Sequence, residues 1–420
     1  MDRLTAVELQ QEDWRVVDGD ACAWFEAPSH AAGAALVARI AELPDGGGQA
    51  GGSRIAERAD GNGMPDVDLR ASGVRIRIRA VSSSGLSADV AQAQAISAAA
   101  RELGLVPDPA VLQSVRVAID AVDKASVRSF WRTVLGYEPL GTDGLGDPQR
   151  RDPAISFHPQ DPPRPLRNRL HVDVVRPPAA VEAAKAAIGR EAYGAYQLTV
   201  ADDEGNEVDL VPGGQLSEDS DWHTLFGAMT FYPTTSPVQA SHLATAVAEL
   251  ADDLGVPMLV DLRPDGVTID GGKDQWEDSE GQPEPRFVEL AGRIQAAARD
   301  LALVPDPTNL RFVQFGIDAL DVPAVRAFWT TLLGYQHDPR TELTDIYDPR
   351  RLNPVLFFQQ LDGADEGRRR QRNRIHLAVC VPSDQAQACV DAALATGGRV
   401  VNDTTLADPE GNEVILSTQP

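Results

Sequence analysis

The chain has 420 residues, of which 43% are hydrophobic, and it carries a formal net charge of −25. That charge excludes a nucleic-acid partner, because phosphate binding requires a basic face. No run approaches the roughly 18 apolar residues of a membrane span, and the first residues lack the apolar stretch of a signal peptide. The three cysteines (Cys22, Cys380 and Cys389) are scattered. We therefore expect a cytoplasmic protein with no membrane partner and no disulfide framework.

Four motifs occur twice in the same order, at an offset of about 200 residues, which indicates one architecture used twice. The pairs are VPDPAVLQSVRVAID (106–120) with VPDPTNLRFVQFGID (304–318), SFWRTVLGY (129–137) with AFWTTLLGY (327–335), NRLHVDV (168–174) with NRIHLAV (373–379), and DDEGNEVDLVP (202–212) with DPEGNEVILST (408–418). Two copies of a two-part unit predict four domains of ordinary size. We place them at 1–106, 107–214, 215–304 and 305–420.

The first part of each half predicts the order strand, helix, strands, helix. It starts with the strand-like run at 21–27, and the amphipathic helix that follows is matched in the second half by the helical spacing of Leu243, Val247 and Leu250. Apolar residues alternate with arginine over 74–79, as expected of a half-buried strand. The Gly-rich insertion at 45–52 is predicted to be a loop.

The second part of each half predicts two rounds of strand, helix and strands. Asp123 and Asp321 are the expected N-caps of helices that bury Trp131 and Trp329 in the core. Later strands are predicted at 154–160 and 355–360, and later helices at about 179–189 and 384–395. The basic run at 368–370 is expected to be a solvated loop.

The second part resembles the vicinal oxygen chelate family, which is the glyoxalase and bleomycin-resistance superfamily. The resemblance covers about 109–213 and 307–420. It rests on a strand followed by D-x6-FW-x3-LGY, on the N-R-[LI]-H strand, and on the terminal D-x-E-G-N-E strand. It implies paired βαβββ modules around a shared cleft, with four inward positions that commonly hold a divalent metal.

The first part resembles the pterin-4a-carbinolamine dehydratases, on a framework of Pro65-Asp66, a strand, and Gly85-Leu86-Ser87. The family's histidines are missing: Gly63-Met64, Val81 and, in the second half, Gly255-Val256 stand at their positions. Since that reaction needs an imidazole to move protons, we expect degenerate domains serving as scaffold, dimerisation surface or lid. The expected fold class is α+β, a tandem duplication of a dehydratase-like domain plus a paired βαβββ chelate domain.

The chelate resemblance implies two sets of candidate metal ligands, one per copy, each on the first, fourth, fifth and last strands. The sets are Arg116, His158, His171 and Glu207 in the first copy, and Gln314, Gln359, His376 and Glu413 in the second. The nitrogen and oxygen donors suit Zn²⁺, Fe²⁺, Mn²⁺ or Ni²⁺. Arginine cannot ligate a metal. The first set therefore offers either a two-histidine-one-carboxylate site or no metal.

A metal-free alternative assigns catalysis to the same residues. Glu207 or Glu413 would be the general base, and Arg116 would bind a substrate anion. Arg169 and Arg374, which precede the paired histidines, are further candidates for substrate binding. The clefts are expected to differ, because Arg116 and His158 in one copy correspond to Gln314 and Gln359 in the other.

These features favour an enzyme of the glyoxalase-like superfamily that acts on a small molecule by lyase, isomerase or oxygenase chemistry. Two alternatives remain: a non-catalytic protein that sequesters a small molecule, as bleomycin-resistance relatives do, and a structural scaffold. The two chelate domains are expected to pack as an intramolecular pseudo-dimer, and a homodimer is left open. The substrate, the metal and the productive copy are not specified by the sequence.

Overall fold

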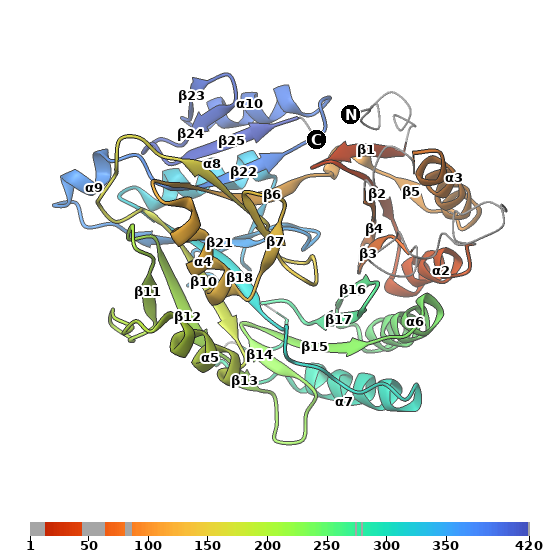
Figure 1. Cartoon of the computed structure of the whole chain (residues 1–420). Coiled ribbons are helices and arrows are strands. Elements are labelled where there is room, and N and C mark those ends of the chain that lie inside the picture. Colours follow the sequence, from red (N-terminus) through yellow and green to blue (C-terminus); the bar gives the residue numbers. More distant parts are fainter. Residues whose placement is uncertain (1–12, 44–63, 80–85, 274, 279, 419–420) are drawn as a thin grey trace. The chain divides into compact units, whose positions relative to one another are not determined.

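The computed structural model describes residues 13–43, 64–79, 86–273, 275–278 and 280–418 (Figure 1). The expected loop at 45–52, and with it Gly63, Val81 and Gly85, lies outside these residues. The chain forms two compact units. Unit 1 comprises Met1–Leu112, Gln215–Pro307 and Gln419–Pro420, and unit 2 comprises Gln113–Gly214 and Thr308–Thr418. Each unit therefore takes one part from each half of the chain.

Unit 1 contains the order strand, helix, strands, helix in both halves. In the first half the elements are β1 (Trp14–Val17), β2 (Asp20–Glu26), α2 (His30–Ala41), β3 (Asp66–Arg70), β4 (Gly73–Ile78), α3 (Leu86–Glu102) and β5 (Val106–Pro107), followed by a 3-10 turn (Pro109–Val111). In the second half they are β13 (Gly214–Gln215), β14 (His223–Leu225), β15 (Gly227–Pro233), α6 (Pro237–Leu254), β16 (Leu259–Arg263), β17 (Gly266–Asp270) and α7 (Pro285–Asp300).

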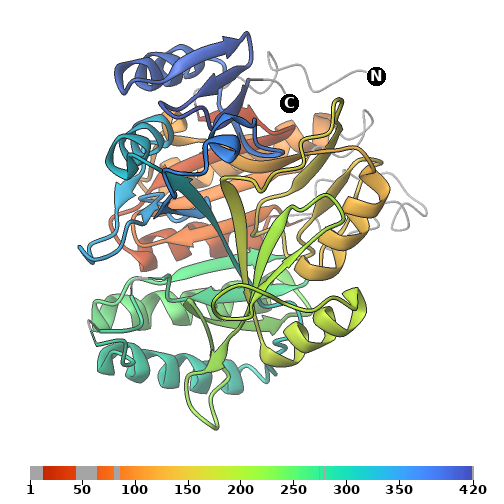
Figure 2. The same cartoon turned by 90° about the vertical axis from the view of Figure 1, so that its left-hand side faces the viewer.

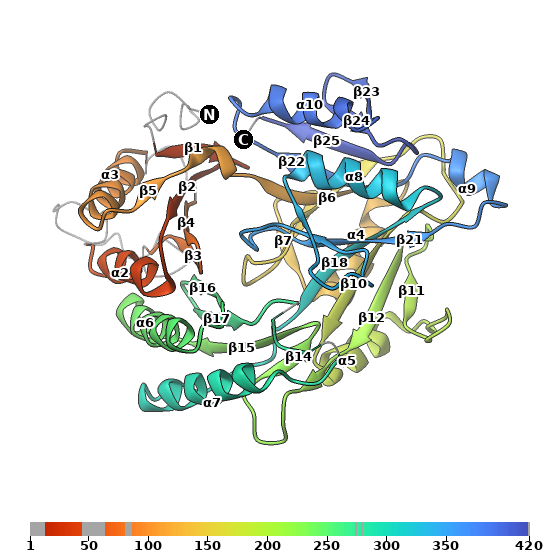
Figure 3. The same ribbon diagram turned by 180° about the vertical axis from the view of Figure 1, so that it is seen from behind.

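All the strands of unit 1 join one ten-stranded sheet. Its order is β1-β2-β4-β3-β16-β17-β15-β14-β13, with β5 paired to β2, so the antiparallel pair β3–β16 connects the two halves. The four helices lie on one side of this sheet (Figures 1 and 3). Strand residues of alternating position, such as Val67 and Leu69, enter the core beneath the helices. This is the period-2 burial that the sequence predicts.

The opposite face of the β3–β16 pair carries a buried network of charges. Asp68 lies directly opposite Asp261 in the strand register. Arg263 Nη2 is 2.7 Å from Asp68 Oδ1, Arg75 Nε is 2.6 Å from Asp68 Oδ2, and Arg70 Nη2 is 2.8 Å from Asp261 Oδ1. Burial by itself raises the pKa of Asp68, but the charges of Arg263 and Arg75 outweigh it and hold that pKa well below its usual range. The two halves of unit 1 are thus joined by ion pairs as well as by strand hydrogen bonds.

Unit 2 also repeats one order of elements. The first half supplies β6 (Ser114–Ala121), α4 (Lys124–Leu135), β7 (Glu138–Leu140), β8 (Gly144–Gly146), β9 (Ile155–Pro159), β10 (Leu170–Arg176), α5 (Pro178–Ile188), β11 (Thr199–Ala201) and β12 (Glu207–Pro212). The second half supplies β18 (Phe312–Ala319), α8 (Val322–Leu333), β19 (Gln336–His337), β20 (Ile346–Tyr347), β21 (Val355–Gln360), α9 (Glu366–Arg370), β22 (Ile375–Cys380), α10 (Ala386–Ala395), β23 (Arg399–Asn402), β24 (Thr405–Ala407) and β25 (Glu413–Ser417).

The two sheets of unit 2 each combine strands from both halves of the chain. The seven-stranded sheet has the order β11-β12-β10-β18-β21-β20-β19, and the eight-stranded sheet has the order β23-β24-β25-β22-β6-β9-β8-β7. Strand β10 pairs antiparallel with β18, and β22 pairs antiparallel with β6. Figure 2 shows the yellow-green β10 beside the blue-green β18, although these strands are far apart in the sequence. Each half of the chain therefore contributes one module to each sheet: three of the modules are βαβββ, and the module of β10, α5, β11 and β12 is βαββ.

The predicted helix starts and core residues of unit 2 are confirmed. Asp123 accepts hydrogen bonds from the backbone of Ala125 and Ser126, and Asp321 caps α8 in the same way. Trp131 and Trp329 are fully buried, and each also donates its indole N–H to an aspartate, Asp202 at 3.1 Å and Asp408 at 3.2 Å respectively. No helix in the described ranges combines the length and the apolar character needed to cross a membrane.

Candidate functional site

Each sheet of unit 2 has a face turned away from the helix-packed core, which we call its site face. On β18, Val313, Phe315 and Ile317 are core residues, so Gln314 and Gly316 belong to the site face. The same alternation on the other strands places every candidate ligand on a site face. Polar and charged side chains thus gather on one face of each sheet.

The eight candidate ligands are not grouped by copy. The site face of the eight-stranded sheet carries Arg116 and His158 from the first half with His376 and Glu413 from the second. The seven-stranded sheet carries the other four: His171, Glu207, Gln314 and Gln359. Strand pairing between the halves causes this exchange, because β10 pairs with β18 and β22 pairs with β6. The expected sets, one per copy, are therefore not found together. Each sheet instead carries two candidate ligands from the first half of the chain and two from the second.

Residues of the recurring N-R and E-G-N motifs form hydrogen bonds that connect the two halves of unit 2. Arg374 is fully buried and donates to the backbone carbonyl of Leu166 at 2.8 Å, to that of Gly205 at 3.0 Å and to the side chain of Asn206 at 2.8 Å. Arg169, at 2% exposure, donates to the carbonyls of Glu410 and Gly411. Both arginines were expected to bind substrate, but each donates hydrogen bonds to residues of the opposite half of unit 2.

Glu207 and Gln359 do not converge with His171 on the seven-stranded sheet. Glu207 receives Tyr193 Oη at 2.9 Å on one carboxylate oxygen and Arg167 Nε at 2.5 Å on the other. Burial and the hydrogen bond to Glu207 raise the pKa of Tyr193, so its hydroxyl stays protonated and donates. Gln359 is exposed. These contacts occupy both oxygens of a carboxylate that the family resemblance implies as a ligand.

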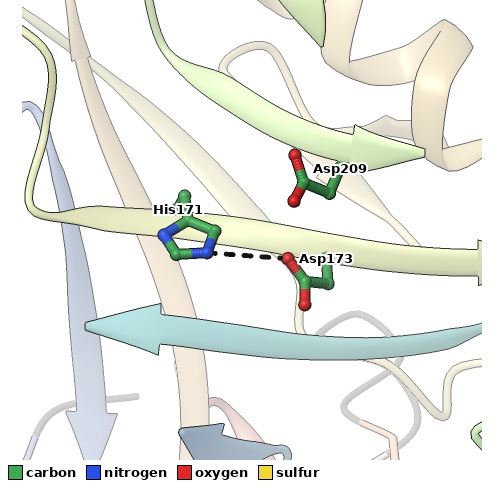
Figure 4. Close-up of side chains that lie close together, drawn as sticks. All are labelled: His171, Asp173 and Asp209. Carbon is green, nitrogen blue, oxygen red and sulfur yellow. Dashed lines mark ion pairs between the residues drawn. The ribbon is translucent and has the colours of Figure 1, made fainter. Parts of the chain in front are cut away.

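A different set of side chains converges on His171. Ligand atoms of His171, Asp173 and Asp209 all lie within 4.8 Å of one another (Figure 4). His171 and Asp173 come from β10, and Asp209 comes from the neighbouring β12, where it is opposite Asp173 in the register. Gln314 of β18 donates from Nε2 to Asp173 Oδ2 at 2.9 Å. The cluster is thus positioned by three adjacent strands.

The imidazole of His171 is buried, with 5% of its surface exposed, and lies across β18. Its Nε2 is 3.7 Å from Asp173 Oδ1, and its Nδ1 has no hydrogen-bond partner among the described residues. Its edge-on neighbour is the ring of Phe357, at 5.5 Å between centroids. A Cβ on Gly316 would lie 2.3 Å from His171 Cε1, so the glycine gives the ring its space. A buried imidazole with an unused nitrogen is suited to binding a ligand.

The eight-stranded sheet has a different centre, built on Asp120. Asp120 Oδ2 accepts Arg372 Nη1 at 2.9 Å, lies 3.2 Å from His376 Nε2, and is also paired with Arg164. Arg372 Nε holds Glu413 at 2.7 Å. Burial alone raises the pKa of Asp120, but the contacts with His376 and Arg164 outweigh it and hold that pKa well below its usual range.

The corresponding pair on the seven-stranded sheet is Asp318 with Arg368. Arg368 is buried and also donates from Nη2 to the carbonyl of Asn168 at 2.6 Å. The expectation of a solvated loop at 368–370 is therefore wrong for Arg368, because helix α9 turns this side chain inward toward a buried carboxylate. Arg369 and Arg370 are exposed as expected, but they too belong to helix α9 rather than to a loop, and Arg370 pairs with the exposed Glu366 at 2.8 Å.

Asp120 should make the free energy of unfolding depend on pH. Because its folded pKa lies below the unfolded value of about 4, its contribution is present above that pH and is lost as the pH falls through the folded pKa. We expect Asp120→Asn to be less stable than the wild type at pH 7 and the difference to shrink below about pH 4. Urea unfolding of both proteins between neutral and acid pH measures it. A stability difference that does not change with pH would contradict this assignment.

Sequence reasoning identified His171 and Gln314 but missed Asp173 and Asp209. The signal was present, because H-x-D on β10 and E-x-D on β12 place the second residue of each pair on the same face as the first. The resemblance to the chelate family implies only the first residue of each pair, His171 and Glu207, as a ligand. Asp120 and Asp318, which occur at the same place in the repeated strand, were also available.

Residues 116–211 and 314–417 match a family model described as "Glyoxalase-like domain". These two segments, which contain both site faces, are therefore glyoxalase-like domains. No curated protein matches the chain. The crystal structure of the cppA protein from Streptococcus pneumoniae TIGR4 resembles 72% of this chain over 97% of its own length, with 9% identity and a TM-score of 0.34. At that score the likeness has no bearing on function.

Proposed function

We propose that the protein is a metal-dependent enzyme that acts on a small molecule through two neighbouring oxygen atoms, at the site face of the seven-stranded sheet. The convergence of His171, Asp173 and Asp209 supports this most directly. The glyoxalase-like domains support it independently, because such domains often hold a divalent ion.

The donor set fits a divalent cation. Two carboxylates and one imidazole supply oxygen and nitrogen donors, which suit Zn²⁺, Mn²⁺, Fe²⁺ or Ni²⁺. Two negative charges on Asp173 and Asp209 would balance the charge of the ion, whereas without a cation they repel each other. Gln314 fixes the orientation of Asp173 through the 2.9 Å hydrogen bond. Second contacts of this kind are characteristic of metal ligands.

The remaining residues of this face position a carboxylate beside the cluster. A bound divalent ion would polarise the substrate's oxygens. Glu207 is two residues from Asp209 on the same strand and the same face. Arg167 and Tyr193 fix its orientation through hydrogen bonds to its two carboxylate oxygens. We infer that Glu207 serves the reaction as a general base rather than as a ligand.

Elemental analysis of the purified protein, reconstituted with Zn²⁺, Mn²⁺ or Fe²⁺, tests the metal. We expect about one ion per chain in the wild type and in His376→Ala, and none in His171→Ala, because only the seven-stranded sheet surrounds its histidine with two aspartates. His376 is the matched control, since it occupies the equivalent position on the other sheet. Wild-type protein that stays metal-free, or an ion lost from His376→Ala but kept by His171→Ala, would refute the proposal.

We also propose that unit 1 is a pair of dehydratase-like domains, duplicated in tandem with the chelate domains, that has lost its original chemistry. The repeated order of strand, helix, strands and helix supports this. So does the absence of histidine at the described positions Met64 and Val256. An assay of carbinolamine dehydration should therefore show no rate above the uncatalysed one, and measurable turnover would overturn this part of the proposal.

A further inference from the structure

The site face of the eight-stranded sheet differs from its counterpart in charge at three matched positions. On the seven-stranded sheet Gln314 lies opposite Asp173, which lies opposite Asp209. On the eight-stranded sheet Arg116 lies opposite Ala378, which lies opposite Ile415. Two negative charges have been replaced by apolar side chains, and a neutral amide has been replaced by a cation. At these three positions the face has one cation and no carboxylate, which favours an anion over a metal ion beside Arg116.

His376 supplies a second polar group on the same face. Its side chain is 1% exposed, and neither Nδ1 nor Nε2 has a hydrogen-bond partner among the described residues. Nε2 faces the Asp120 carboxylate at 3.2 Å, so Nδ1 is the ring nitrogen turned away from that carboxylate and left for a ligand. A buried polar nitrogen without a partner destabilises the folded protein. A ligand that offers a hydroxyl group at Nδ1 would remove that destabilisation.

The position that faces His376 from the next strand but one is smaller and more polar than the one that faces His171. On the seven-stranded sheet Phe357, opposite Gly316 in the register, packs its ring against His171. The matched position on the eight-stranded sheet is Ser156, opposite Ala118. Its hydroxyl lies 2.9 Å from His158 Nε2. A small hydroxyl group thus stands where the other sheet has an aromatic ring.

Arg116 and His376 are diagonal neighbours on adjacent strands, since Arg116 is opposite Ala378 and His376 is opposite Ala118. Such neighbours are about 7–8 Å apart, within reach of a long side chain. We propose that this face is a second small-molecule site, which binds a small hydroxycarboxylate with its carboxylate at Arg116 and its hydroxyl donating to His376 Nδ1. This site is separate from the metal cluster, and it requires no metal.

Nuclear magnetic resonance of the full-length protein tests the site, with lactate as probe and acetate as the analogue that lacks the hydroxyl group. The protein has 7 histidines, so the ring signals of His376 can be assigned by comparison with His376→Gln. We expect lactate to shift these signals saturably, and acetate to bind about tenfold or more weakly, because it leaves Nδ1 without a donor. Equal effects of the two acids, or no shift with either, would overturn the proposal.

Two substitutions that copy the other sheet provide the decisive comparison. Ala378→Asp places a carboxylate opposite Arg116, and Arg116→Gln removes the cation, so each should weaken lactate binding about tenfold or more while the His376 signals report an intact fold. His171→Ala should leave the lactate-dependent shift unchanged even though it removes the metal proposed above, which separates the two proposals. Lactate binding that survives Ala378→Asp, or that His171→Ala abolishes, would contradict the second site.

Discussion

Alanine at position 316 is expected to weaken metal binding by the seven-stranded sheet about 10- to 100-fold, the range found when the supports of a metal ligand are altered. The added Cβ would lie 2.3 Å from Cε1 and 2.4 Å from Nε2 of His171, and 2.6 Å from Cζ of Phe357. These separations are far inside van der Waals contact, so the imidazole must leave its place beside Asp173. Titration of the metal-free protein with Zn²⁺ measures the loss.

The matched control for Gly316→Ala is Ala118→Gly. Ala118 lies opposite His376 in the register, as Gly316 lies opposite His171, so alanine is already accommodated at the equivalent place. We expect Ala118→Gly to leave the affinity for Zn²⁺ unchanged. A folded Gly316→Ala protein that binds Zn²⁺ as tightly as the wild type would show that His171 is not a ligand in this position.

Replacing Asp68 by alanine is expected to lower the free energy of unfolding by about 3–5 kcal/mol, the usual cost of removing one partner of a buried ion pair. Asp68 and Arg263 have side chains that are 1% and 2% exposed, and Arg75 shares the same carboxylate. The substitution leaves the guanidinium groups of Arg263 and Arg75 buried without this carboxylate, and water does not reach them to replace the lost ion pairs. Chemical denaturation followed by circular dichroism measures the change.

An exposed ion pair on helix α7 provides the control for Asp68. Glu289 and Arg293 are 2.6 Å apart with side chains 51% and 44% exposed, so Glu289→Ala should cost about 0.5 kcal/mol or less. If Asp68→Ala costs no more than Glu289→Ala, the charge network on β3 and β16 does not stabilise the junction of the two halves.

Much of the fold follows from local patterns in the sequence. The caps at Asp123 and Asp321 and the repeated FW pair are short-range signals, and each predicts its own helix correctly. The strand at 355–360 was predicted at the residues where β21 lies. In the structure, alternate residues of each strand are buried in the core, and the candidate ligands occupy the other positions, on the site faces.

The pairing between halves could not be predicted in the same way. The alternation of apolar and polar residues on β10 is compatible with either β6 or β18 as its neighbour, because these two strands have similar sequences. The composite sheets therefore bring His171 to Gln314 rather than to Arg116, and this changes the chemistry of both faces. The roles of Arg169 and Arg374 were missed for the same reason, since their acceptors lie in the opposite half.

The two site faces of unit 2 should differ in their occupants, with a metal ion on the seven-stranded sheet and none on the eight-stranded sheet. Anomalous diffraction from crystals grown with Mn²⁺ or Zn²⁺ tests this most directly, because it locates the ion among the side chains. We predict one peak, beside His171, Asp173 and Asp209 on the seven-stranded sheet, and no peak beside His376. A peak at His376 and Glu413, or no peak on either sheet at saturating metal, would contradict the account.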